Sequence, residues 1–238
     1  MIDELEPIAA KYGADKTGAH FYTQHYHRHF NEIRDKPIRL LEIGIGGYED
    51  PNRGGNSLRM WRDYFPKGII SGLDISPKRG IAEDRIKVYQ GSQADPVTIA
   101  NILNDTEGRE FDIIVDDGSH RSEHIIASFY MLFPCLSADG WYAIEDTSTS
   151  YWSNYGGANG GAGYPQTTMS FFKDLIDGLN WQEIHRPHYV PSYFDQKIVG
   201  IHFYHNLILI KKGHNWEGST YVKDNIVPYQ SGILEKRD

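Results

Sequence analysis

Residues 38–47 read IRLLEIGIGG, a short apolar run that leads directly into closely spaced glycines. The run 38–43 has the length and the apolar, partly β-branched character of a buried strand. The glycines after it favour a loop in which a ligand lies against the backbone, because no Cβ is present to push it away. Ser57 then stands where it can cap a helix that runs to Phe65. This order of strand, glycine loop and helix is the opening βα unit of an α/β fold.

The alternation of strand and helix continues along the chain. Short apolar runs bounded by turn residues predict strands, and helical spacing of apolar residues predicts helices. The further predicted strands are 69–74, 86–89, 111–115, 141–144, 198–204 and 207–211. The predicted helices are 4–12, 23–31, 57–65, 95–104, 122–136 and 167–180. The last two strands flank the turn-prone pair His205-Asn206 and predict an antiparallel hairpin. The whole pattern predicts a mostly parallel, doubly wound sheet of about seven strands.

Two segments lie outside this alternation. Residues 1–36 contain two short predicted helices around a turn at 13–16, with Thr23 as an N-cap. We predict that they form a helical cap segment on a single domain that spans 37–238. Residues 147–165 read TSTSYWSNYGGANGGAGYP and show neither a helical nor a strand period. Loops of this length inside compact domains are often active-site lids, so we expect this one to take part in substrate selection.

The composition narrows the class of protein. With 238 residues, 39% of them hydrophobic, the chain suits one compact domain. A net charge of -8 with scattered Lys and Arg argues against a nucleic-acid partner. The apolar runs fall well short of the roughly 20 residues of a membrane helix, and the acidic N-terminus has no signal-peptide character. The single cysteine, Cys135, excludes an internal disulfide. We therefore expect a soluble cytoplasmic protein that binds neither nucleic acid nor membrane.

The loop after the first strand favours a nucleotide-type ligand without a pyrophosphate. Gly44 and Gly46 lack the third glycine of the dinucleotide fingerprint, since Glu49 stands at that position. S-adenosylmethionine fits better, and Asp74 at the end of the second strand supplies an acidic group for its ribose hydroxyls. Gln93, just past the third strand, is placed to reach the adenine amino group. Alternatively, Asp74 only caps the turn that follows it, and Gln93 has no ligand role.

Acidic pairs follow two consecutive strands of the predicted sheet. Asp116 and Asp117 end the fourth strand, and Glu145 and Asp146 end the fifth. Because such strands are commonly neighbours and open on one crevice, Asp117, Glu145 and Asp146 can converge. Clustered carboxylates repel one another unless a cation is present, and no Lys or Arg is obviously placed to serve. Oxygen ligands suit a hard divalent cation, so the sequence predicts a Mg²⁺ or Mn²⁺ site.

His120 is the candidate base of this site. It stands three residues beyond Asp117, and the ordinary pKa of histidine lies near neutrality. A substrate hydroxyl on the cation would lose its proton to His120 more easily and would then attack the methyl group of a sulfonium. Either acidic pair alone can also be a turn or a loop edge. Both pairs together, with a histidine attached, indicate a catalytic site for a substrate with vicinal hydroxyls.

Several of these segments resemble one known family. They are KYGADKTGAHFYTQHYHRHF, LEIGIGGYEDPNRGGNSLRMWRDYFPKGIISGLDI, QGSQAD, DDGSH and AIEDT. Together they resemble the macrocin- and mycinamicin-type sugar O-methyltransferases, metal-dependent enzymes that act on deoxysugars of macrolide and related natural-product glycosides. The resemblance implies a Rossmann-like class I methyltransferase fold, S-adenosylmethionine and magnesium as cofactors, and a homo-oligomer. The positions that match the family's magnesium ligands are Asp117, Glu145 and Asp146, its general base is matched by His120, and its cofactor-binding residues are matched by Glu42, Gly44, Ser57, Asp74, Gln93 and Asp116.

The resemblance makes methyl transfer to a sugar hydroxyl the leading hypothesis. The expected acceptor is a rhamnose-like sugar on a natural-product glycoside, as in antibiotic biosynthesis. Tyr151, Trp152 and Tyr155 of the long loop can stack on the apolar face of a sugar. The same metal chemistry suits a catechol-like aromatic diol, and the residues alone do not separate these two acceptors. A third hypothesis is a non-catalytic S-adenosylmethionine-fold binding protein, since fold alone does not imply chemistry.

Overall fold

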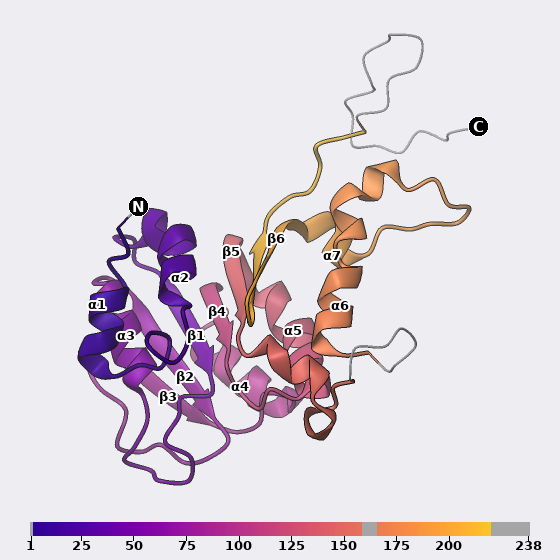
Figure 1. Ribbon diagram of the computed structural model, residues 1–238. Coiled ribbons are helices and arrows are strands. Elements are labelled where there is room, and N and C mark those ends of the chain that lie inside the picture. Colours follow the sequence, from indigo (N-terminus) through magenta and orange to yellow (C-terminus); the bar gives the residue numbers. More distant parts are fainter. Residues whose placement is uncertain (1, 159–165, 220–238) are drawn as a thin grey trace.

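The computed structural model describes residues 2–158 and 166–219 as a central sheet with helices on both faces (Figure 1). Within these residues the sheet has seven strands, hydrogen-bonded in the order β3-β2-β1-β4-β5-β7-β6. Their bounds are β1 Arg39–Ile43, β2 Ile69–Asp74, β3 Ile86–Gln90, β4 Phe111–Asp116, β5 Leu136–Ile144, β6 Ile198–Tyr204 and β7 Leu207–Lys212. The first five strands are parallel, whereas β7 runs antiparallel to both β5 and β6. The predicted mostly parallel sheet with a C-terminal hairpin is confirmed.

The order of the strands reverses at β1. From there the chain adds β2 and β3 on one side, and it then returns to add β4 and β5 on the other side. Ile43 at the end of β1 pairs with Leu73 of β2 and with Asp116 of β4. In open sheets of this kind, ligands bind beyond the carboxyl ends of the strands at such a reversal. The loops after β1, β2 and β4 are therefore the ones that position a site.

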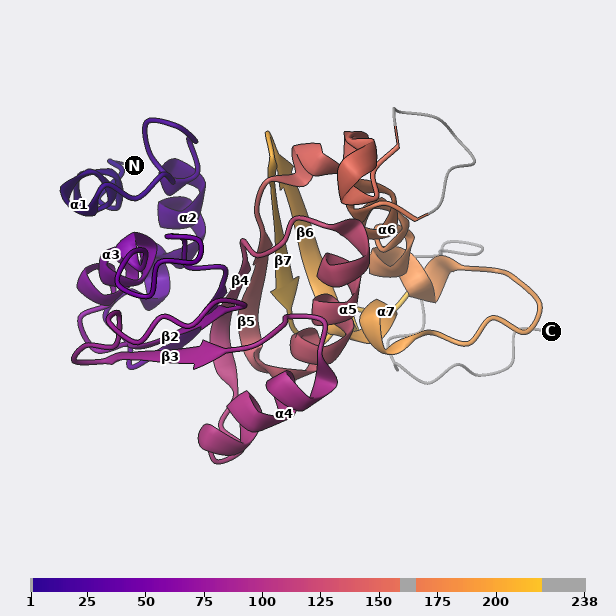
Figure 2. The same cartoon turned by 90° about the horizontal axis from the view of Figure 1, so that it is seen from below.

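Helices connect the strands and cover both faces of the sheet. Their bounds are α1 Glu6–Tyr12, α2 Thr23–Phe30, α3 Asn56–Tyr64, α4 Pro96–Asp105, α5 Ser122–Leu132, α6 Thr168–Asp174 and α7 Tyr193–Lys197. Short 3-10 turns span Asn31–Ile33, Phe133–Cys135, Thr147–Tyr151, Ser153–Tyr155 and Asp177–Glu183. Figure 2 separates the two layers, with α1, α2 and α3 on one side of the sheet and α5, α6 and α7 on the other. In the described part of the chain, no helix combines the length and the apolar character needed to cross a membrane.

Alternating side chains of the strands supply two separate cores. On β1, Leu40 belongs to the core shared with α1, α2 and α3, whereas Leu41 and Ile43 belong to the core shared with α4, α5 and α6. In the first core, Phe30 of α2 and Trp61 of α3 are fully buried, with ring centroids 6.2 Å apart. Burial of such rings is a large apolar contribution to stability. The segment before β1 therefore shares a core with the sheet, and this packing fixes α2 relative to the strand ends.

Two predicted helix caps are wrong. Thr23 is the first residue of α2, whose N-cap position is occupied by Tyr22 without a side-chain cap bond. Ser57 likewise lies inside the first turn of α3, whose N-cap is Gly55 in the left-handed conformation. A glycine reaches this conformation at little cost, and the helix begins there without a hydroxyl cap. The Ser57 hydroxyl is therefore free of a capping role.

Pro134 shortens one predicted helix and lengthens the strand after it. The helix predicted over 122–136 ends as α5 at Leu132 and continues only as a 3-10 turn. Proline has no N–H to extend the helical hydrogen bonds. The following strand, β5, consequently begins at Leu136 and is longer than the predicted 141–144.

The region after β5 contains more regular structure than predicted. Instead of an irregular loop, residues 147–155 form two 3-10 turns in which Thr149 and Ser150 are buried. The rest of the predicted loop, 159–165, lies outside the described residues. The helix predicted over 167–180 is divided into α6 and a later 3-10 turn.

Candidate functional site

A cavity of about 940 Å³ opens at the carboxyl ends of β1 to β4. The loops after these strands line it, together with the start of α3 and the turn that precedes α2. Its size falls within the range of small-molecule sites, roughly 300–1,000 Å³. The predicted site residues on its wall are Gly44, Gly46, Ser57, Asp74, Gln93, Asp117, His120 and Asp146. Glu42, Asp116 and Glu145 are buried and do not belong to that wall.

Two glycines in the loop after β1 have different structural roles. Gly44 has φ +79°, and a Cβ there would lie 2.1 Å from the carbonyl oxygen of Asp117. Gly46 has φ +70°, but the nearest atom to a Cβ would be Gly54 Cα at 3.9 Å. Gly44 is thus required by the close approach of the two loops, whereas Gly46 leaves the backbone accessible on the cavity wall.

Lys78 anchors the same loop from the segment between β2 and β3. Its side chain is buried, and Nζ donates to the carbonyl oxygen of Tyr48 and to those of Asp50 at 3.1 Å and Arg53 at 3.3 Å. Three acceptors satisfy the three donors of the ammonium group, which offsets the cost of burying its charge. Lys78 therefore links three positions of the loop to one another. The sequence had not singled out this lysine.

Asp74 ties the loops after β1 and β2 together. Its Oδ2 accepts a hydrogen bond from Ile45 N at 3.2 Å, and its Oδ1 accepts one from Ser76 N at 2.8 Å. The second bond is the turn cap that stood as the alternative to a ribose contact. A carboxylate offers about four lone-pair sites, so both bonds leave it able to accept from a ligand in the cavity. The cap and the ligand role are compatible.

Gln93 and Asp116 form a bridge beneath the cavity. Gln93 Nε2 donates to both oxygens of Asp116, at 2.8 and 3.1 Å, and its Oε1 accepts from Ser119 N at 2.8 Å. Asp116 is 1% exposed, and burial raises its pKa to about 6. Both polar groups of Gln93 therefore have partners within the protein, and its predicted adenine contact stays a prediction. The pair fixes the turn that carries Asp117 and His120.

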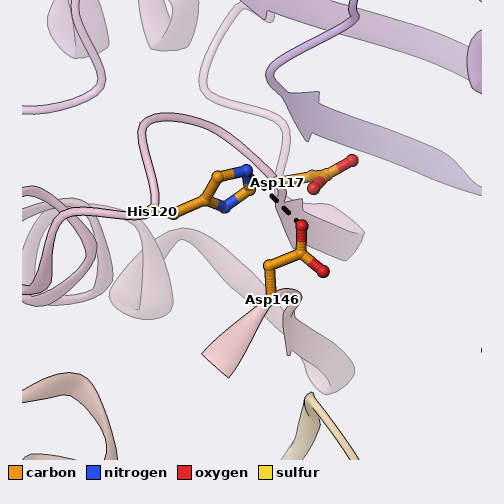
Figure 3. A group of neighbouring side chains, drawn as sticks. All are labelled: Asp117, His120 and Asp146. Atoms are coloured by element: carbon orange, nitrogen blue, oxygen red, sulfur yellow. Dashed lines mark ion pairs between the residues drawn. The ribbon is translucent and has the colours of Figure 1, made fainter. Parts of the chain in front are cut away.

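Asp117, His120 and Asp146 meet at the wall of the cavity (Figure 3). One ligand atom from each of the three lies within 4.8 Å of the other two. His120 Nε2 lies 3.6 Å from Asp146 Oδ2, and the three side chains are 19%, 24% and 26% exposed, in sequence order. The two carboxylates can supply oxygen ligands for a divalent cation, and the imidazole beside them can accept a proton. We call these three residues the open group.

Two members of the open group have a backbone conformation that is unusual outside glycine. His120 has φ 55° and Asp146 has φ 51°. This left-handed region costs a non-glycine residue roughly 1–2 kcal/mol, so the surrounding structure must hold it. The Thr149 hydroxyl lies 2.9 Å from the carbonyl oxygen of His120 and 3.0 Å from that of Asp146. It therefore links the two strained positions.

Glu145 belongs to a second, buried group that surrounds Lys16. Lys16 is fully buried, and its Nζ lies 2.7 Å from Glu145 Oε1, 3.0 Å from Asp117 Oδ2 and 3.0 Å from Glu42 Oε1. The expectation that no Lys or Arg neutralises the carboxylates is therefore wrong. Lys16 lies in the turn before α2, where a lysine ordinarily suggests solvent exposure. Its only signal in the sequence is its place in a segment that resembles the family.

The buried group contains three carboxyl groups and one ammonium group. Burial, together with Glu145, raises the pKa of Asp117, and burial raises the pKa of Glu145 to about 7 although Lys16 opposes this. Glu42 Oε1 is within ion-pair distance of Lys16, yet neither oxygen of Glu42 accepts a hydrogen bond from the described residues. Three carboxylates thus share one ammonium group. A divalent cation at the neighbouring open group would favour the ionised form of these carboxyl groups, so the donor set fits such an ion.

The surroundings of His120 favour its neutral form. Burial lowers the pKa of His120, and this effect outweighs the opposing charge of Asp146. Its Nδ1 is buried without a hydrogen bond from the described residues, whereas Nε2 faces Asp146. A neutral imidazole can accept a proton at neutral pH. The geometry is therefore compatible with the predicted role as a base.

Tyr151 and Tyr155 lie in the two 3-10 turns that follow Asp146, and Trp152 stands between these turns. Tyr151 is 46% exposed and Trp152 is 51% exposed, and the rings of Trp152 and Tyr155 have centroids 5.9 Å apart. None of the three belongs to the wall of the cavity.

Comparisons with known proteins place this geometry in context. No family model matches the chain. The 8-demethyl-8-(2-methoxy-alpha-L-rhamnosyl)-tetracenomycin-C 3'-O-methyltransferase of Streptomyces olivaceus is 42% identical over 91% of this chain and 55% of the relative. The demethylmacrocin O-methyltransferase of Streptomyces fradiae and the mycinamicin VI 2''-O-methyltransferase of Micromonospora griseorubida are each 43% identical over 90% of this chain and 54% of the relative. The chain spans about half the length of these curated relatives.

Comparison with solved structures also finds an enzyme of mycinamycin biosynthesis. The MycE methyltransferase of mycinamycin biosynthesis, in complex with Mg and SAH, matches with a TM-score of 0.87 and 41% identity over 94% of this chain and 58% of that chain. A structure of the same enzyme with Mg, SAH and mycinamycin VI has a TM-score of 0.86 and 42% identity, and the match covers 93% of this chain and 57% of that chain. The chain is therefore a homologue of the macrocin- and mycinamicin-type sugar O-methyltransferases, which it matches over about half of their length.

Proposed function

We propose that this chain is an S-adenosylmethionine-dependent, magnesium-dependent O-methyltransferase that acts on a hydroxyl of a deoxysugar, rhamnose-like, in a natural-product glycoside. The observation that carries the proposal is the open group of Asp117, His120 and Asp146 on the wall of a cavity of about 940 Å³. Further support comes from relatives that are named as O-methyltransferases of a rhamnosyl tetracenomycin and of demethylmacrocin, and from MycE, whose structure contains Mg, SAH and mycinamycin VI.

In this proposal the cofactor occupies the cavity at the strand ends. Gly46 leaves the backbone open to it, and Asp74 offers its remaining lone pairs to the ribose hydroxyls. Ser57 also lies on the wall, with its hydroxyl free of a capping bond. Gly44 and Gln93 also lie on the wall, whereas Glu42 and Asp116 act from behind it through contacts with other residues.

Asp117 and Asp146 would hold the magnesium ion from the open side, and Glu145 would complete the ligand set from the buried side. When bound, the ion supplies positive charge that makes an acceptor hydroxyl more acidic. His120 accepts the hydroxyl proton at Nε2. Because this nitrogen faces Asp146, the imidazolium that results lies beside a carboxylate that stabilises its charge.

We place the acceptor on the side of the segment that follows Asp146. The exposed rings of Tyr151 and Trp152, with Tyr155 beside them, offer flat apolar surface to a sugar or its aglycone. In this placement the acceptor and the cofactor approach the open group from different sides. A homo-oligomeric state and a cytoplasmic location stay predictions from the sequence.

Methyl transfer to matched acceptors tests the proposal. The purified chain is incubated with S-adenosylmethionine that carries a labelled methyl group, with Mg²⁺, and with either a rhamnosylated polyketide or a catechol. We expect label in the rhamnoside and loss of transfer in EDTA. Label in the catechol alone would favour the aromatic-diol hypothesis. No transfer, and no heat of binding with S-adenosylhomocysteine, would favour a non-catalytic protein.

A further inference from the structure

The carboxylates at the ends of β4 and β5 are covered on one side by the segment before β1. Side chains from the turn and from α2 reach them, although these residues lie about a hundred positions away in the chain. Lys16 contacts Asp117 and Glu145, as described above. The hydroxyls of Tyr22 and Tyr26 reach Asp146 and Glu145 respectively. Each predicted metal ligand therefore has a partner from this one segment.

Tyr22 contacts one oxygen of Asp146, and the other oxygen is left to the side of His120. Its hydroxyl lies 2.7 Å from Asp146 Oδ1 and 3.2 Å from the carbonyl oxygen of Asn206 in the turn between β6 and β7. The single proton of the hydroxyl makes its better bond to the nearer, charged acceptor. The opposite oxygen, Oδ2, faces His120. The carboxylate is thus held in one orientation at a residue whose left-handed backbone already needs support.

Tyr26 holds Glu145 in a comparable way from deeper in the core. Its hydroxyl donates to Glu145 Oε1 at 2.6 Å, next to the contact of that oxygen with Lys16. The ring is fully buried between Phe30 and Trp61, with centroids 5.2 and 5.1 Å away. A ring packed in this way has little freedom to move, so it fixes the carboxylate that it contacts.

We infer that Tyr22 is a positioning residue for the metal site, because its hydroxyl orients the Asp146 carboxylate from the side opposite to His120. The inference rests on the proposed function, which makes Asp146 a magnesium ligand. Partners that hydrogen-bond to ligating carboxylates fix the orientation of the ligand, and their removal typically costs about 10–100-fold in metal affinity or activity. Tyr26 is the second member of this supporting set, through Glu145.

If Tyr22 had a purely structural role, its hydroxyl would only link the start of α2 to the turn between β6 and β7. Tyr12 is a matched control for such a role, because it is also a tyrosine of the N-terminal segment that donates to an aspartate. Its hydroxyl lies 2.5 Å from Asp63 of α3, and neither residue belongs to the cavity wall or to the acidic cluster. Tyr12→Phe and Tyr22→Phe each remove one oxygen atom and one hydrogen bond to a carboxylate.

The test measures metal affinity, cofactor affinity and stability separately. Mn²⁺ binding is followed by electron paramagnetic resonance, S-adenosylhomocysteine binding by calorimetry without metal, and Tm by heating in EDTA. We expect Tyr22→Phe to raise the Kd for Mn²⁺ by about 10–100-fold and to leave the Kd for S-adenosylhomocysteine within about twofold. Tyr12→Phe should leave both constants unchanged, whatever its effect on Tm. Tyr26→Phe provides an independent second variant, with the same direction expected.

Each outcome bears on a definite claim. If Tyr22→Phe and Tyr26→Phe bind Mn²⁺ as tightly as the parent chain, the inference is wrong and the proposed function stands. If Tyr12→Phe weakens Mn²⁺ binding as much as Tyr22→Phe does, the effect is structural and the inference is again wrong. If the parent chain binds no Mn²⁺, both the inference and the metal part of the proposed function are wrong.

Discussion

The carboxyl groups at the strand ends form one acidic cluster, which comprises the buried group around Lys16 and the open group on the cavity wall. We call these its buried half and its open half, and their negative charges have different partners. In the buried half, Glu42 and Glu145 surround the ammonium group of Lys16. In the open half, Asp146 faces the imidazole of His120 on the wall of the cavity. Asp117 belongs to both halves, with Oδ2 at 3.0 Å from Lys16. The protein thus supplies its own cation where solvent is excluded, and it leaves room for an external cation where the cavity opens.

Removal of the base from the open half should lower the rate of methyl transfer. We expect His120→Asn to lower kcat by about 10²–10⁴-fold, the usual contribution of a general base, while S-adenosylhomocysteine still binds. Asparagine tolerates the left-handed backbone at this position, so the variant keeps the turn. His188→Asn is a matched control, since His188 also has a positive φ, of 62°, and is exposed. Initial rates with the rhamnoside acceptor compare the two. A control as slow as His120→Asn would contradict this assignment.

Removal of the ammonium group of Lys16 from the buried half should lower the free energy of unfolding. Lys16→Met leaves three carboxylates without their ammonium partner, and breaking a buried ion pair in this way costs about 3–5 kcal/mol of unfolding free energy. Urea unfolding in EDTA near neutral pH measures the loss. Lys212→Met serves as the control, because Lys212 is also buried but, among the described residues, donates only to backbone carbonyls, for example that of Pro134 at 2.9 Å. Its expected cost is about 1–3 kcal/mol. Equal losses would show that the carboxylates around Lys16 have no special effect.

The stability of the buried half should depend on pH through Glu145. The pKa of Glu145 is raised from 4.5 to about 7 in the folded protein, chiefly by burial. A carboxyl group with a raised pKa stabilises the fold fully below its unfolded pKa, and this contribution is lost as the pH rises toward 7. In EDTA, the parent chain should therefore lose stability relative to Glu145→Gln between about pH 4.5 and 7, by at most about 1.4 kcal/mol per pH unit. Urea unfolding of both proteins across this range measures the difference. Parallel stability curves would mean that Glu145 is not the group that titrates.

Much of the fold follows from local patterns in the sequence. Apolar runs such as 38–43 and 111–115 are long enough for strands and are separated by helical segments. This alternation was sufficient to predict the mostly parallel sheet. The strand ends then bring Asp117 and Asp146 together, because carboxyl ends of parallel strands share one edge. Helix ends were less predictable, since Gly55 and not Ser57 begins α3.

The internal arrangement of the site depended on contacts that local patterns do not contain. Lys16 reaches Asp117 from a turn about a hundred positions earlier, and a lysine in a turn ordinarily lies in solvent. Asp146 has a left-handed backbone, which a non-glycine residue seldom adopts and which the sequence pattern did not predict. The bond between Gln93 and Asp116 likewise joins two residues that each had a predicted ligand role. Such pairings require the folded positions of distant segments.

Direct titration with Mn²⁺ tests the central claim, that the open half holds one divalent cation beside the cofactor cavity. The parent chain and Asp146→Asn are titrated in the presence of S-adenosylhomocysteine, and free Mn²⁺ is followed by electron paramagnetic resonance. We predict one bound ion per parent chain and a Kd at least about tenfold higher for Asp146→Asn. A parent chain that binds no Mn²⁺, or an Asp146→Asn variant that binds it with unchanged affinity, would contradict the account.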